Sequence, residues 1–130
     1  MADLEQARRI VELMVLTAWA DGRVEGSEAL AIHKLVIAVP ELRAVGPTGE
    51  ISRDTKARLG EIGLLEAVKE AAQAITDTKY RELAFQCCAK ISAADGELVA
   101  EEAEVLTELQ TLFGFTADDV KRLLVLATHG

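Results

Sequence analysis

The chain has 130 residues, of which 50% are hydrophobic and only 4% aromatic, and its formal net charge is −8. Phosphate backbones select basic surfaces, so this charge argues against nucleic acid as a partner and against docking on anionic membranes. The length predicts one domain over residues 1–130, large enough to bury its own core. The first residues are polar and no apolar run approaches a membrane span, so we expect a cytoplasmic protein without direct membrane insertion.

Helix-forming residues dominate, and the two prolines fall close together at positions 40 and 47, so we expect an all-α protein. Asp3 is a good N-cap for a first helix, because Gln6 follows three residues later with capping-box spacing. The apolar face of this helix repeats with helical period at Ile10, Leu13, Met14 and Thr17. Asp21-Gly22 is expected to end the helix.

A second helix is expected from Gly26 or Ser27 to Val39, where Pro40 stops it. Residues 40–50 contain both prolines and two glycines, so we expect a loop there, and disorder if the chain has any. Ser52 then predicts the start of a short helix to about Leu59, which Gly60 and Gly63 interrupt.

The second half of the chain predicts further helices over about residues 64–75, 78–93 and 100–113, and a last one that ends near residue 128. Asp77 caps the second of these, Asp95-Gly96 turns the chain into the third, and Gly114 stops it. Thr116 and Asp119 have the spacing of a capping box for the last helix. About seven helices are predicted in all.

One short motif occurs twice. Ala20-Asp21-Gly22-Arg23-Val24 is followed by Glu28, and Ala94-Asp95-Gly96-Glu97-Leu98 is followed by Glu102 at the same spacing, 74 residues later. The flanking apolar positions match as well: Ile10, Val11 and Met14 align with Ala84, Phe85 and Cys88, and Ile32, Leu35 and Val39 align with Leu106, Leu109 and Phe113. We therefore expect two helix-turn-helix repeats related by a pseudo-twofold axis within one bundle.

The repeated acids are the candidate functional residues. Glu28 and Glu102 each share a helical stripe with three apolar residues, so both are predicted to face inward, beside Asp21 and Asp95 in the preceding turns. A carboxylate on an apolar face must be paired, hydrogen-bonded or metal-bound. Two interpretations follow: each Asp–Glu pair fastens its own corner through turn and helix-start amides, or the four acids Asp21, Glu28, Asp95 and Glu102 bind a divalent cation, calcium or magnesium.

Each motif matches half of a calcium EF-hand loop. Asp21, Gly22, Val24 and Glu28 fit positions five, six, eight and twelve, as do Asp95, Gly96, Leu98 and Glu102. The first and third ligand positions hold Thr17 and Trp19 in one copy, and Ile91 and Ala93 in the other. Neither loop completes an EF-hand, so a cation site requires acids from both turns.

With these motifs the sequence resembles the tellurite-resistance TerB family over nearly the whole chain. The phrase from Ile91 to Leu98, with Glu101 and Glu102, is the most specific part of the likeness. Similar domains stand at the N-terminus of DnaJ-like co-chaperones. The resemblance implies an all-α fold of about seven helices with pseudo-twofold halves, and divalent-cation binding by the acids at Asp21, Glu28, Asp95 and Glu102.

Other chemistry has weaker support. Cys87 and Cys88 are adjacent within a predicted helix, so we expect reduced, buried thiols, with a soft-metal or metalloid site as the alternative. Eight acids and no Lys or Arg lie in residues 91–120, either as a solvated face or as a cation- or partner-binding surface. His33 and His129 fall outside the motifs, and we expect His33 to be half-exposed.

These observations favour a non-enzymatic domain that acts as a divalent-cation-responsive interaction module in tellurite or stress response. The alternative is a metal-independent adaptor, similar to a co-chaperone domain, that binds a protein partner through an acidic or apolar face. An acid-cluster metallohydrolase is a third hypothesis, but the sequence has no nucleophile–base pair, phosphate loop or zinc-ligand spacing to support it.

Overall fold

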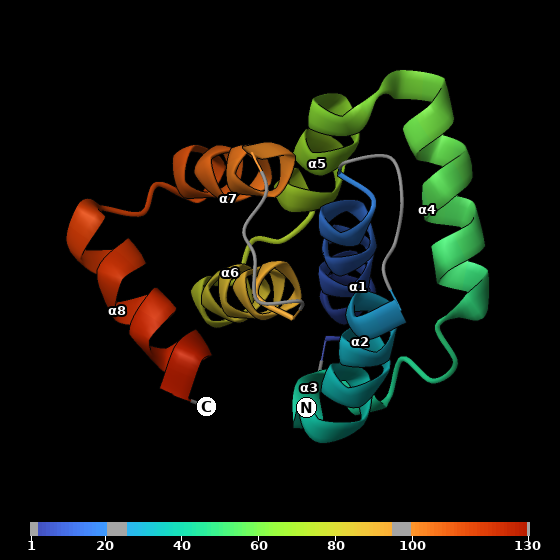
Figure 1. Cartoon of the computed structure of the whole chain (residues 1–130), viewed down its shortest axis with the longest axis horizontal. Helices are drawn as coiled ribbons and strands as arrows, with labels where there is room; N and C mark the ends of the chain where they lie inside the picture. The colour runs from blue at the N-terminus through green and yellow to red at the C-terminus, as the bar shows by residue number, and fades with distance from the viewer. Residues whose placement is uncertain (1–2, 21–25, 95–99, 130) are drawn as a thin grey trace.

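A computed structural model describes residues 3–20, 26–94 and 100–129, and for residues 26–28, 128 and 129 it describes the backbone alone. The regular structure in this described part of the chain is entirely helical (Figure 1). The helices are α1 (Leu4–Ala18), α2 (Gly26–Ala38), α3 (Pro40–Arg43), α4 (Gly49–Ile62), α5 (Leu64–Gln73), α6 (Thr78–Ser92), α7 (Ala100–Phe113) and α8 (Ala117–His129). The all-α prediction is confirmed, and within the described residues the short α3 raises the count from about seven helices to eight.

Helix α1 begins where the sequence predicts. The Asp3 carboxylate accepts a hydrogen bond from the backbone N–H of Gln6, and the Gln6 side-chain amide donates to the other Asp3 oxygen at 2.7 Å. At the far end the helix stops at Ala18, with Trp19 as its C-cap. The Asp21-Gly22 turn expected to follow it lies outside the described residues.

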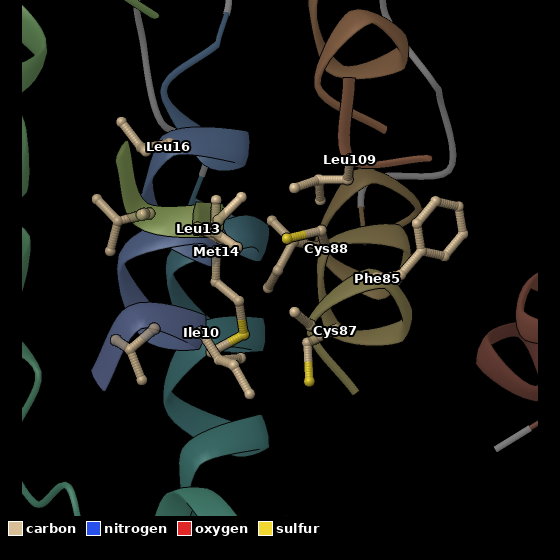
Figure 2. Packing of buried hydrophobic residues seen from close by; sticks show 14 of the residues in the cluster. Ile10, Leu13, Met14, Leu16, Phe85, Cys87, Cys88 and Leu109 are labelled. Atoms are coloured by element: carbon tan, nitrogen blue, oxygen red, sulfur yellow. The ribbon is translucent and has the colours of Figure 1, made fainter. Parts of the chain in front are cut away.

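Helix α1 lies at the centre of the fold between α4 and α6, and it also packs on α2, α3 and α5 (Figure 1). Its predicted stripe is fully buried, and in Figure 2 Leu13 and Met14 face Cys88 of α6 across the interior, with Leu109 of α7 close by. Because neighbours surround α1, burial extends well beyond one face. The buried side chains are Ala7, Ile10, Val11, Leu13, Met14, Val15, Leu16, Thr17 and Ala18.

The prediction of a loop over residues 40–50 is wrong in part, because α3 and the start of α4 lie within this range. Pro40 ends α2 but also opens α3, since a proline at the first helical position lacks only an N–H that the helix does not use. Leu42 of α3 is fully buried, which gives this short helix a reason to form. Helix α4 begins at Gly49 rather than Ser52.

Helix α4 also ends later than expected. The sequence predicts an end near Leu59 with Gly60 as an interruption, but Gly60 lies inside the helix, which continues to Ile62. Gly63 then ends it with φ of 85°, in the left-handed region that favours glycine. A single glycine costs a helix only about 1 kcal/mol, which the flanking turns of α4 tolerate.

The caps predicted in the second half are confirmed. Asp77 accepts from the backbone N–H groups of Lys79 and Tyr80 at the start of α6, and Gly114 follows α7 with φ of 71°. Thr116 and Asp119 form the expected reciprocal capping box at the start of α8.

The helix boundaries repeat at the offset of the motif. Helices α1 and α6 each have 15 residues, and their starts, their ends and their N-caps Asp3 and Asp77 are all 74 residues apart. Helices α2 and α7 begin 74 residues apart as well. Both helices pack on α1 and on α6, but their third neighbour differs, because α2 packs on α3 and α7 packs on α5. The pseudo-twofold relation between the two halves stays a prediction.

Candidate functional site

Glu102 is the one predicted site residue whose side chain the structure describes. It lies in the first turn of α7 and is only 3% exposed, whereas its neighbour Glu101 is exposed. The prediction that Glu102 faces inward is confirmed. A carboxylate held in this place must have its charge compensated, by helix-start amides or by a cation.

The other three predicted ligands are not placed. Asp21 and Asp95 lie outside the described residues, and for Glu28 only the backbone, in the first turn of α2, is described. Among the described residues, no three His, Cys, Asp or Glu side chains group as ligands of a metal ion. The assembly of four acids into one site is therefore a prediction that the described geometry does not test.

The segments that flank the two motifs do approach each other. Ala94, the residue before Asp95, lines a groove together with Leu30 and Ala31, which follow Glu28 by less than one helical turn. Helix α2 packs against α6 at this place. The end of α6 and the beginning of α2 thus bring the described neighbours of both acidic motifs to one region.

Trp19 lies at the C-terminal end of α1, close in sequence to the first motif. It is the C-cap of α1, two residues before Asp21, and is partly buried against the core. The Lys56 ammonium of α4 lies 4.3 Å from the centre of its indole ring, within the range of a cation–π contact. Because Trp19 is only two residues from Asp21, we expect its fluorescence to report on changes at the first motif.

The two cysteines are free and buried, as expected. Burial raises the pKa of the Cys87 thiol, and likewise that of Cys88, to about 12. Soft metals bind the thiolate, so these protonated and enclosed thiols are poor ligands for the alternative metalloid site. Cys88 instead packs between α1 and α6 next to Thr17 and Met14 (Figure 2).

The acidic stretch is divided between solvent and helix caps. Glu101 and Glu104 point to solvent on α7, and Glu108 is half-buried. The Thr116 backbone and hydroxyl hydrogen-bond Asp119 and hold the pKa of its carboxyl below the usual value. For these residues the stretch behaves as a solvated face and a helix cap.

Sequence reasoning missed the outward side of α2. Leu30 and Ile37 are 52% and 56% exposed, and His33, expected to be half-exposed, lies on the exposed side of the same helix. Eight of the ten residues 29–38 are apolar, a pattern typical of a helix buried all round. A comparison with residues 103–112 at the offset of 74 gives the missing signal, because polar residues take the exposed positions there.

None of the helices in the described residues combines the length and the apolar character that a membrane span requires. Comparisons of the chain with protein-family models, with curated proteins and with solved structures found no match. The resemblance to the TerB family therefore stays an expectation that rests on the sequence motifs.

Proposed function

We propose that the chain is a non-enzymatic helical domain whose two acidic motifs bind a divalent cation and so set the state of an interaction module. The observation that carries the proposal is the burial of the Glu102 carboxylate in the first turn of α7. A hard cation is ligated by carboxylate oxygens, and a buried acid at the start of a helix supplies one.

The convergence of the flanking segments supports pooling of the two motifs. Leu30, Ala31 and Ala94 line one groove, so the chain leaves α6 and enters α2 in the same region. Each motif supplies one Asp and one Glu as predicted ligands, too few for the six to eight oxygens that calcium takes. Four acids from both repeats, completed by water and backbone oxygens, reach that number.

Thermal melts decide between a cation site and a structural corner. If the wild type binds calcium or magnesium, its free energy of unfolding rises by about 2.7 kcal/mol at a hundredfold excess of ion over the dissociation constant. Glu102→Gln abolishes this gain. Glu104→Gln is the matched control, because Glu104 is an exposed acid on the same helix, and it retains the gain.

A structural corner gives a different pattern. Glu102→Gln then lowers stability by about 1–3 kcal/mol, equally in chelator and in millimolar ion. A wild-type midpoint that does not move with either ion removes the cation hypothesis and leaves the corner.

The second candidate is a metal-independent adaptor. The exposed apolar side of α2 favours it, since a soluble helix bundle gains nothing from leaving Leu30 and Ile37 in water. The sequence likeness to co-chaperone domains agrees with an adaptor role. A link to tellurite or to stress response rests on the likeness to the TerB family alone.

A further inference from the structure

The outward side of α2 has the most exposed large apolar side chains of the described residues. Leu30 and Ile37 are seven positions apart and therefore lie on one side of the helix, about 10 Å apart along its axis. Lys34 lies between them and is also exposed. We call Leu30, Lys34 and Ile37 the α2 face.

Helix α7 of the same chain provides a comparison for the α2 face. At the offset of 74 residues, Leu30, Lys34 and Ile37 correspond to Glu104, Glu108 and Thr111 of α7. Glu104 and Thr111 are exposed, and Glu108 is half-buried. Helix α7 begins at the matching position and has nearly the same length, but it carries polar or acidic residues where α2 carries apolar and basic ones. Formation of the helix therefore does not require apolar residues on the α2 face.

Two grooves flank the α2 face. One, of about 380 Å³, is lined by Leu30, Ala31, Lys34, Leu35, Lys90 and Ala94. The other, of about 330 Å³, is lined by His33, Val36, Ile37, Arg43 and residues 46–48. Both grooves are mainly apolar, with room for side chains of a partner.

The described ionisable side chains that line these grooves are opposite in sign to the net charge of the chain. The ionisable residues among the described linings are Lys34 and Lys90 in one groove and His33 and Arg43 in the other, all of them basic. The Arg43 Nε donates to the Ile37 carbonyl at 3.1 Å and so keeps the guanidinium at the rim. These basic side chains beside an apolar floor favour an acidic, amphipathic occupant.

We propose that the α2 face is a docking site for an acidic amphipathic helix of a partner protein. Apolar side chains of that helix, spaced three or four residues apart, enter the two grooves, and its flanking carboxylates meet Lys34, Lys90 and Arg43. The inference rests on the proposed function only in that the domain is an interaction module. Docking itself needs no cation.

The probe for this proposal is a synthetic helical peptide of about five turns, with leucines on one face and glutamates on both flanks. The wild-type protein binds it in chelator, as measured by fluorescence anisotropy of the labelled peptide. The same peptide with lysines in place of the glutamates binds at least about tenfold more weakly, because it meets the basic rim with like charge. Measurement in chelator separates this test from the cation test.

The variant Leu30→Glu/Ile37→Thr gives the α2 face the residues that α7 carries at the matching positions. It is expected to weaken binding of the acidic peptide by about tenfold or more, since the change removes the apolar anchors. The matched control is Leu126→Glu/Val125→Thr on α8, where both side chains are 49% exposed. Circular dichroism melts confirm that both variants stay folded.

The α8 variant is expected to bind like the wild type. Equal binding of the acidic and basic peptides, loss of binding in the α8 variant, or unchanged binding in the α2 variant overturns the proposal. Sedimentation of the unliganded protein tests whether a second copy of the chain occupies the α2 face instead. If the wild type is a dimer and Leu30→Glu/Ile37→Thr is a monomer, a second copy covers the face and the proposal of an acidic partner helix is wrong.

Discussion

Single residues in this protein show how burial changes the state of an ionisable group. Cys87 and Cys88 are enclosed between α1 and α6, and the loss of hydration raises the pKa of each thiol to about 12 from the ordinary value of 9.0. Glu102 is almost as deeply buried but carries a carboxylate, so its place depends on compensation by amides or by a cation. The first effect makes the thiols inert, and the second makes Glu102 the residue to test.

The thiols predict a loss of stability at alkaline pH. Below about pH 9 the thiols are protonated in both the folded and the unfolded state, so their contribution to stability is fully present. Between about pH 9 and 12 the unfolded chain releases the protons first, and the free energy of unfolding falls by about 1.4 kcal/mol per thiol and pH unit. Urea unfolding of the wild type and Cys87→Ala at pH 8.5 and 10.5 measures the difference in slope.

The Cys87→Ala variant is expected to lose less stability over that interval than the wild type, even if it is less stable at both pH values. A bulky maleimide should also label the native thiols slowly at neutral pH. Identical pH slopes, or rapid labelling of the folded protein, would show that solvent reaches the thiols and would revive the metalloid hypothesis.

At the scale of the helix, local chemistry predicted the well-capped elements and failed where packing decided. Asp3, Asp77 and Gly114 mark helix ends through hydrogen bonds or backbone geometry that depend on a few neighbouring residues. Helix α3 forms because Leu42 finds a buried site, and this contact is not visible in a sequence rich in turn-forming residues. Gly60 was expected to break a helix that the surrounding turns sustain.

The candidate functional residues could likewise be predicted from the sequence only where local pattern decides. The inward direction of Glu102 follows from the helical period, and the structure confirms it. The α2 face was not predicted, because an apolar sequence does not say which of its sides the rest of the chain covers. That depends on α1, α3 and α6, which pack on α2 from one side only and leave Leu30 and Ile37 in water.

Gly60 inside α4 and Gly63, which caps its end, provide a matched test of these helix rules. Gly60 lies within the helix, and apart from the adjacent backbone of α4 a Cβ there would meet no atom within 4 Å, so Gly60→Ala is expected to stabilise the protein by about 0.5–1 kcal/mol. Gly63 has φ of 85°, so Gly63→Ala is expected to destabilise it by about 1 kcal/mol. Chemical denaturation of both variants tests the pair, and a loss of stability in Gly60→Ala would mean that α4 is interrupted there after all.

Over the whole molecule, stability is distributed unevenly around α1. Helices α1 and α6 bury long stretches of side chains against each other and against α5 and α7. Helix α4 buries only Ile51 and Thr55 and covers α1 from outside, and α8 lies on the opposite side of the bundle, packed on α6 (Figure 1). The exposed Arg58–Glu70 ion pair, at 2.7 Å, joins α4 to α5 but adds little in water. We therefore expect α4 to open without unfolding the centre.

Native-state hydrogen exchange measures this difference. Amides of α1 and α6 should exchange only through global unfolding, and amides of α4 through a smaller opening with a lower free energy. Ile10→Ala removes a fully buried side chain at the centre and is expected to cost about 2–5 kcal/mol and to lower protection throughout. Ile51→Ala should lower protection in α4 while leaving α1 unchanged. Equal loss in α1 and α4 after Ile51→Ala would show instead that the bundle unfolds as one cooperative unit and that α4 belongs to it.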